Sequence, residues 1–300
     1  MAGVELSAPV ALRRRVAAAL YRRPAVKLAL LLALPLGWMA LVYLGALASL
    51  LVTAFWRLDP LTSTVQQVWG LQNFRTLLED PVYRTITLRT VGMAAAVTAT
   101  DIVLAFPIAY HIARVASPRT RQALLLAVVM PLWSNYLVRV FAWKTILEGG
   151  GMADWVFGRL LHLPDVHLAA TNWAVWITFC YLWLPFVILP IATALERVPA
   201  SYLEASADLG ARGWTTFRRV VLPLALPGVV AGSIFSFSLT LGDYITPPLV
   251  GKGFFIGNAI YNYVGLASNL PLAAAFAAVP IAIMGVYLVV AKRLGAFEAL

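Results

Sequence analysis

The sequence predicts an all-α integral membrane protein, and three observations carry that prediction. Hydrophobic residues make up 61% of the 300 residues, and the mean hydropathy is +0.83. Charged residues make up only 12%, against about 25% in an ordinary soluble domain. Six stretches are long and apolar enough to cross about 30 Å of hydrocarbon as helices. A soluble chain of this length could not hide so much apolar surface.

The six predicted transmembrane helices contain several prolines, which bundled spans tolerate because neighbouring helices satisfy the freed backbone groups. Between the first two spans, residues 57–86 form a longer loop, in which the segment NFRTLLEDP predicts a short amphipathic helix ended by Pro81. The predicted spans cover residues 28–55, 87–110, 122–146, 172–194, 220–246 and 271–292.

The distribution of Lys and Arg predicts the orientation, because these residues collect at the cytoplasmic ends of spans. Fifteen lie on the side that holds both termini and six on the other side, so both termini are expected in the cytoplasm. Residues 1–27 form a cytoplasmic basic segment, and residues 28–300 form the transmembrane domain. Residues 11–23 either lie on the inner membrane surface as a helix or simply anchor the first span. The net charge of +10 therefore does not indicate a nucleic-acid partner.

The sequence shows no pattern typical of a metal or catalytic site. The single cysteine, Cys180, lies in an apolar run, which excludes an intramolecular disulfide and a cysteine-based metal site. His162 and His167 are separated by Pro164 and have no third ligand nearby. No phosphate-binding G-x-x-x-x-G-K-[ST] segment occurs, so the chain is not expected to hydrolyse ATP itself.

The charged stretch EASADLGARGWTTFRRVVLPLALPG, residues 204–228, lies between the fourth and fifth spans. It predicts one helix that ends at Gly210 and a second that begins at Trp214 and runs into the fifth span. Gly210 is expected at the turn, where a positive φ would strain any residue with a Cβ. The small side chains of Ala205, Ser206 and Ala207 would give this elbow, at about 197–219, a low surface for docking into a groove of another protein.

The elbow resembles the EAA motif of permease subunits of bacterial ABC importers, which reads E-A-A, three residues, Gly, nine residues, Ile-x-Leu-Pro. Glu204, Ala205, Gly210, Leu222 and Pro223 stand at the matching positions, whereas Ser206 replaces the second Ala and Val220 the Ile. The segments NFRTLLEDPVYRTITLRTVGMAA, MPLWSNYLVRVFAW and FSFSLTLGDYITPPLVG resemble permeases of the spermidine/putrescine importer group.

The resemblance implies a type I ABC importer permease fold with six transmembrane helices in a bacterial inner membrane. It implies that the elbow is a coupling helix, seated on one of two ATP-binding cassette subunits that hydrolyse ATP. This subunit would then be no enzyme and need no cofactor. A second, homologous permease and an external solute-binding protein would complete the importer. The coupling residues implied are Glu204, Ala205, Ser206, Asp208 and Gly210, while Arg212, Arg218 and Arg219 either join them or only anchor the cytoplasmic side.

Ionisable groups inside spans are costly and indicate function by default. Asp101 either lines the transport pathway and attracts a cation or is satisfied by a neighbouring helix. Asp243 with Tyr244 either meets an ammonium group, as a carboxylate beside an aromatic face, or caps a break in the fifth span. Trp133 and Tyr136 are either cargo contacts or packing anchors.

The predicted function is import of polyamines. One alternative keeps the same machinery and changes the cargo to iron, thiamine or an anion. The other is a self-sufficient secondary transporter or channel, which an internal inverted repeat would indicate; the hydropathy shows none. Which polyamine is carried, and whether the second permease is distinct or identical, stay open.

Overall fold

The computed structural model describes residues 24–156 and 168–293. The basic segment 11–23 and the pair His162 and His167 therefore lie outside the described residues. The chain divides into two compact units, one up to Ala54 and one from Phe55 onward.

The first unit, as far as it is described, is one long apolar helix. Its parts are α2 (Pro24–Trp38), a π-helical turn η1 (Met39–Leu44) and α3 (Gly45–Thr53). Together they give a candidate span of 29 residues, Ala25–Thr53, which is about 44 Å at 1.5 Å per residue. The prediction of a first span over 28–55 is confirmed.

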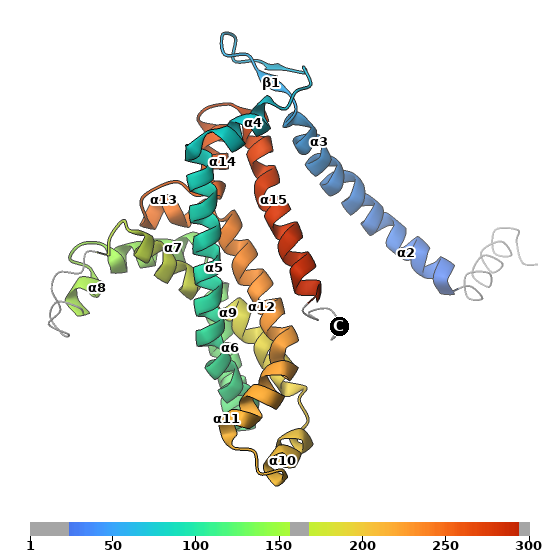
Figure 1. Ribbon diagram of the computed structural model, residues 1–300, viewed down its shortest axis with the longest axis vertical. Helices are drawn as coiled ribbons and strands as arrows, with labels where there is room; N and C mark the ends of the chain where they lie inside the picture. The colour runs from blue at the N-terminus through green and yellow to red at the C-terminus, as the bar shows by residue number, and fades with distance from the viewer. Residues whose placement is uncertain (1–23, 157–167, 294–300) are drawn as a thin grey trace, which may run out of the picture. The chain divides into compact units, whose positions relative to one another are not determined.

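Four long helices of the second unit confirm the second, fourth, fifth and sixth predicted spans. Three of them, α5, α9 and α12, pack against one another and run side by side in Figure 1. The helices are α5 (Pro81–Tyr110), which continues through η2 (His111–Val115), α9 (Asn172–Glu196), α12 (Leu222–Gly242) and α15 (Leu270–Arg293).

The helices α9 and α12 approach closely because glycines of α12 face α9. A Cβ on Gly228 would lie 2.5 Å from the Cβ of Ala194 and 2.6 Å from the carbonyl oxygen of Pro190. One turn later, a Cβ on Gly232 would lie 3.0 Å from the Cα of Val187. Small residues at such contacts let the two helix backbones pack closely. Close packing matters in lipid because the hydrophobic effect does not drive helices together there.

The third predicted span, over 122–146, is bent rather than one straight helix. The helices α6 (Pro118–Val129) and α7 (Tyr136–Leu147) meet at 93° across a 3-10 turn, η3 (Met130–Trp133). Pro131 has no backbone N–H to donate, and the Asn135 side chain accepts from the Leu137 amide at 2.9 Å and so starts a new helix. Counted as one broken span, the bent pair is the sixth candidate span, and the short α8 (Met152–Asp154) follows it.

The loop between the first two spans contains a hairpin and the predicted amphipathic helix. Strand β1 (Arg57–Leu58) pairs antiparallel with β2 (Val65–Gln66). In the turn, the Leu61 amide donates to Asp59 at 2.9 Å, and this bond holds the pKa of the Asp59 carboxyl below its usual value. Helix α4 (Gln72–Glu79) ends before Pro81, as predicted.

After α12 the chain forms two short helices, α13 (Thr246–Val250) and α14 (Ile256–Gly265). Helix α14 is held against α5 by polar contacts. Thr90 accepts from the amide of Ile256 at 3.0 Å, and the hydroxyls of Tyr83 and Tyr263 lie 2.7 Å apart.

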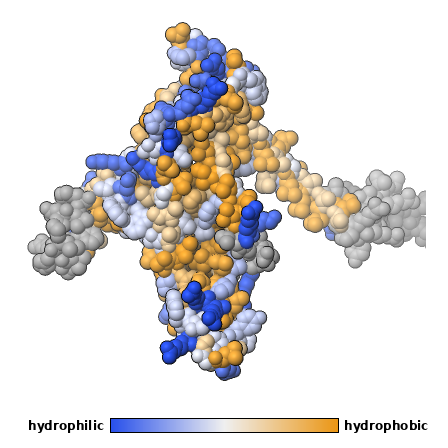
Figure 2. All heavy atoms as spheres, in the orientation of Figure 1, coloured by the Kyte–Doolittle hydropathy of each residue, from blue (hydrophilic) through white to orange (hydrophobic). Residues whose placement is uncertain are grey.

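At the other end of α12 lie α10 (Ala200–Asp208), α11 (Gly213–Thr216) and a π-helical turn, η5 (Phe217–Val221). Figure 2 shows apolar residues over much of the helices and hydrophilic residues gathered around the end where α10 and α11 lie. This end of the second unit carries the elbow expected from the sequence.

Candidate functional site

The elbow turns at Gly210, which has a φ of +73°. The Gly210 amide donates to the carbonyl of Ala207 at 2.8 Å, and the Ala211 amide donates to that of Ser206 at 3.1 Å. These two bonds form a Schellman motif, the helix ending that places a left-handed residue just after the last helical turn. The expected positive φ at Gly210 is therefore present, and α10 ends there for the expected reason.

Ser206 lies on the inner side of the elbow rather than on its docking surface. It is buried, and its hydroxyl lies 2.9 Å from the Thr216 hydroxyl at the end of α11. The expectation that Ser206 shares a low outer surface with Ala205 and Ala207 needs correction, because only the two alanines are exposed. An alanine at 206 could not form this hydrogen bond, so the serine closes the elbow on itself.

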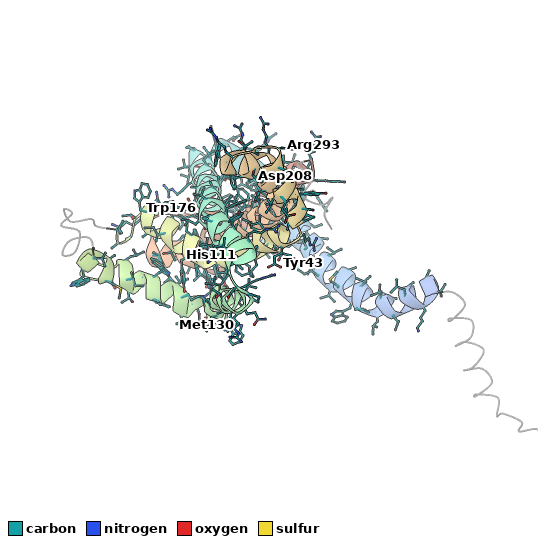
Figure 3. All side chains as sticks on the ribbon, turned by 90° about the horizontal axis from the view of Figure 1, so that it is seen from below. Tyr43, His111, Met130, Trp176, Asp208 and Arg293 are labelled. Atoms are coloured by element: carbon teal, nitrogen blue, oxygen red, sulfur yellow. The ribbon has the colours of Figure 1, made fainter. Side chains whose placement is uncertain are left out.

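The outer surface of α10 is both charged and apolar. Glu204 and Asp208 are exposed, and Asp208 is marked at the elbow in Figure 3. Tyr202 and Leu209, which sequence reasoning missed, are 52% and 88% exposed. The signal that could have found them is a pair of large apolar residues on a short charged helix outside the spans.

A hollow of about 800 Å³ lies between α10 and the segment that follows it. Its lining mixes apolar and basic side chains. The lining includes Tyr202, Ala205, Leu209, Arg212, Thr215 and Arg219. Of the three arginines considered for the elbow, Arg212 and Arg219 border this hollow.

Aromatic contacts join the elbow to the helix bundle. The Phe217 ring packs edge-on against Phe106 of α5, with 5.3 Å between ring centroids. Trp214 stacks on the other side of Phe217 at 5.3 Å, and Leu203 of α10 packs against the buried cluster formed by α5, α9 and α12. These contacts pack the elbow directly against the helix bundle.

Asp101 is fully buried between three helices. Its carboxylate accepts from Ser236 of α12 at 2.7 Å. The Cys180 thiol of α9 lies beside it, and the Thr98 hydroxyl donates to Ser236 at 3.4 Å. Within the described residues, no ion pair joins Asp101 to Arg139. The Arg139 guanidinium instead lies 5.9 Å from the ring centroid of Tyr136. Neighbouring helices thus satisfy Oδ2, whereas the buried Oδ1 has no hydrogen-bond partner among the described residues. The part of Asp101 in the pathway stays a prediction.

Asp243 accepts hydrogen bonds on both of its carboxylate oxygens. The amides of Ile245 and Thr246 donate to Oδ1 at 2.8 Å each. The hydroxyls of Tyr136 and Thr246 donate to Oδ2. The side chain is buried, and it ties the start of α13 to α7.

The aromatic residues proposed for the pathway are in different surroundings. Tyr244 is 46% exposed and stacks on Tyr261 of α14 at 5.2 Å, so it does not share the buried network of Asp243. Tyr136 stacks on Trp183 of α9 at 6.0 Å. Trp133 is 79% exposed at the bend between α6 and α7. Only Tyr136 and Asp243, of the five predicted residues, are brought into contact, and their role in transport stays a prediction.

Within the described residues, no three His, Cys, Asp or Glu side chains lie close enough to hold a metal ion.

Residues 98–296 match the family of binding-protein-dependent transport system inner membrane components. That match includes α9, the elbow and α12. The chain belongs to this family.

Two curated members of the family are similar over most of their length. The inner membrane ABC transporter permease protein YdcU of Escherichia coli is 46% identical over 293 residues, which covers 93% of each chain. The spermidine/putrescine transport system permease protein PotB of Escherichia coli is 31% identical over 261 residues, covering 86% of this chain and 94% of PotB. Both are permeases, and the chain is accordingly a multi-pass membrane protein of the ABC permease type.

A solved structure confirms the type I permease fold. A chain of the bacterial alginate ABC transporter, crystallised with an alginate-bound periplasmic protein, superposes with a TM-score of 0.71. The superposition covers 91% of this chain and 94% of the other, at 16% sequence identity. At that identity the likeness concerns the fold alone.

Proposed function

We propose that this chain is the permease subunit of an ATP-driven importer in the bacterial inner membrane and that its elbow is the coupling helix. The observation that carries the proposal is the construction of α10. A rigid Schellman turn and an internal Ser206–Thr216 hydrogen bond hold it, while Glu204, Asp208 and Leu209 face outward. A short helix that internal hydrogen bonds hold rigid, and whose outer side chains are exposed, is suited to bind another protein and to move with it.

The proposed partners follow from two observations: the sequence has no G-x-x-x-x-G-K-[ST] segment, and its relatives are permeases of transport systems. Two ATP-binding cassette subunits would bind the ATP and supply the energy. A second, homologous permease would complete the pathway, and an external solute-binding protein would deliver the cargo. Membrane lipid surrounds the spans. The crystallised alginate transporter is described with its periplasmic protein, which supports the same kind of arrangement here.

Polyamines are the proposed cargo. The 31% identity to PotB, named as a spermidine/putrescine permease, extends over 261 residues and supports this assignment. Iron, thiamine or an anion is the second candidate, because the bundle also holds Arg139 in a broken span, beside Tyr136. A secondary transporter or channel would need no cassette at the elbow.

A transport assay with the complete importer tests this proposal. The chain is reconstituted into liposomes with the cassette subunits, the second permease and the solute-binding protein of its importer. We expect ATP-dependent uptake of spermidine or putrescine. Uptake that needs ATP but accepts only thiamine, ferric ion or an anion contradicts the cargo, and uptake by the chain without cassettes contradicts the importer class.

The orientation has its own test. Cysteines placed at Ser117 and Ser201, which are both exposed, should be shielded from an impermeant thiol reagent in intact cells. A cysteine at the exposed Thr64 should react. The natural Cys180 is buried and gives little background. Labelling at Ser201 from outside would overturn the cytoplasmic placement of the elbow.

A further inference from the structure

The segment that joins α9 to α10 is short and stiff. Only Arg197, Val198 and Pro199 lie between the end of α9 and the start of α10. Proline fixes its own φ and restricts the residue before it. The elbow therefore cannot swing freely about this link, and whatever holds the link also holds α10.

Arg114 holds this link from a neighbouring helix. It lies in η2, at the end of α5, and its Nη2 donates to the backbone carbonyls of Leu195 and Val198. The Leu195 carbonyl belongs to the last turn of α9, and the Val198 carbonyl directly precedes Pro199. A single guanidinium thus joins the end of α5, the end of α9 and the root of the elbow.

A second arginine holds the same place from α6. Arg121 forms an ion pair with Glu196, the last residue of α9. An arginine near a helix N-terminus and a glutamate at a helix C-terminus each oppose the dipole of their own helix. The dipole of its own helix therefore favours neither charge, and the ion pair between them offsets that cost.

The position of Arg121 is not explained by stability or by the general charge rule. The side chains of Arg121 and Glu196 are 38% and 28% exposed, and ion pairs of that exposure contribute little to stability. The positive-inside rule needs basic residues on this loop but no particular contact. Arg119 meets that rule equally well while being exposed.

We propose that Arg114 and Arg121 form an arginine clamp, which transmits movement of α10 to the helices α5 and α6. The inference rests on the proposed coupling role of the elbow and adds residues that lie outside the motif. When the elbow is displaced, Pro199 limits how far the link can flex, and the clamp carries the displacement to both neighbouring helices. Loss of the clamp would leave α10 seated on its partner but disconnected from the pathway.

The test measures spermidine imported per ATP hydrolysed by the complete importer in liposomes. Arg121→Glu should lower this ratio about five-fold, within the range that coupling substitutions produce, while the cassettes stay bound. The double variant Arg121→Glu with Glu196→Arg should restore the ratio to within about two-fold of the wild type. Arg114→Gln should lower the ratio similarly, because a glutamine of shorter reach replaces a guanidinium shared by two carbonyls.

Arg119→Glu is the matched control, since it makes the same charge change in the same first turn of α6, and its ratio should stay near that of the wild type. A purely structural role would reduce the amount of assembled importer and leave the ratio unchanged. The clamp is contradicted if Arg121→Glu keeps the wild-type ratio, if the double variant does not recover, or if Arg119→Glu is equally impaired. A wild-type importer that fails to bind the cassettes contradicts the proposed function itself, and the clamp with it.

Discussion

The two ends of α12 both carry a bend in the chain, and they treat their polar groups in opposite ways. Before α12, the elbow leaves Glu204 and Asp208 exposed. After α12, Asp243 is buried and receives four hydrogen bonds from its own chain. The first bend keeps its charges available to a partner, whereas the second uses its charge to hold itself together.

This difference predicts which substitutions act on transport and which act on stability. Hydrogen bonds to charged groups contribute about 1.5–3 kcal/mol each, and more is lost when a buried partner stays unsatisfied. Asp243 should therefore matter for the fold. Exposed charges on α10 contribute little to stability, so changes there should be seen in coupling.

The largest effect is expected for Gly210→Leu. At a φ of +73° a residue with a Cβ is strained by about 1–2 kcal/mol, and relief of that strain would turn α10 away from its present direction. Uptake should fall about five- to thirty-fold, the change in a conformational equilibrium that corresponds to 1–2 kcal/mol. Initial uptake rates, with cassette binding and membrane insertion measured in parallel, check this expectation.

Gly213→Leu is the control for the elbow. Gly213 lies three residues further on, has no positive φ, and has open space where a Cβ would stand. The same increase in side-chain size should therefore leave uptake largely intact. Normal uptake by Gly210→Leu would contradict the coupling role of the elbow.

An intermediate effect is expected for the second bend. Asp243→Asn and Tyr136→Phe each remove one partner of the same buried hydrogen bond. Both should lower the midpoint of thermal unfolding by a few degrees, on the order of 2–4 °C per kcal/mol lost. Tyr244→Phe removes a hydroxyl from a half-exposed ring and serves as the control, with no change expected.

The same pair of variants separates a cap from a cargo contact. If Asp243 binds a polyamine, Asp243→Asn should raise the spermidine concentration for half-maximal uptake more than Tyr136→Phe does. That outcome would favour the pathway role predicted from the sequence. Equal loss of stability in both variants favours the cap.

The smallest effect is expected for Asp101→Asn. Asparagine has nearly the same size and retains an oxygen that can accept from Ser236. Initial uptake should stay within about two-fold of the wild type, because the hydrogen bond from Ser236 is kept and the Oδ1 atom has no hydrogen-bond partner to lose. A selective loss of uptake for cationic cargo, at matched expression, would instead show that the charge itself acts on the cargo.

The spans were largely predictable because length and hydropathy report membrane crossing directly. The bend in the third span was not, because hydropathy carries no direction. Pro131 was visible in the sequence, yet bundled spans often tolerate proline. The chain turns because Pro131 is combined with the helix cap at Asn135. The sequence does not show that this combination breaks the helix rather than leaving it continuous.

The candidate site was predictable where its contacts are local. Gly210 follows from helix-ending rules, and its bonds reach back only three to five residues. Ser206 was wrongly predicted to lie on the outer surface of α10. It is buried because its hydroxyl contacts Thr216, which lies on the next helix. The partner of Asp243 is Tyr136, 107 residues away, and no sequence pattern connects residues at that distance.

Site-directed crosslinking from α10 tests the central claim most directly. Leu209, 88% exposed on the elbow, and Leu61, 95% exposed in the hairpin loop, are each replaced by the photoreactive p-benzoylphenylalanine in the assembled importer. The account predicts that the probe at 209 crosslinks to the cassette subunit and the probe at 61 does not. A probe at 209 that never reaches the cassette, or one at 61 that does, would contradict it.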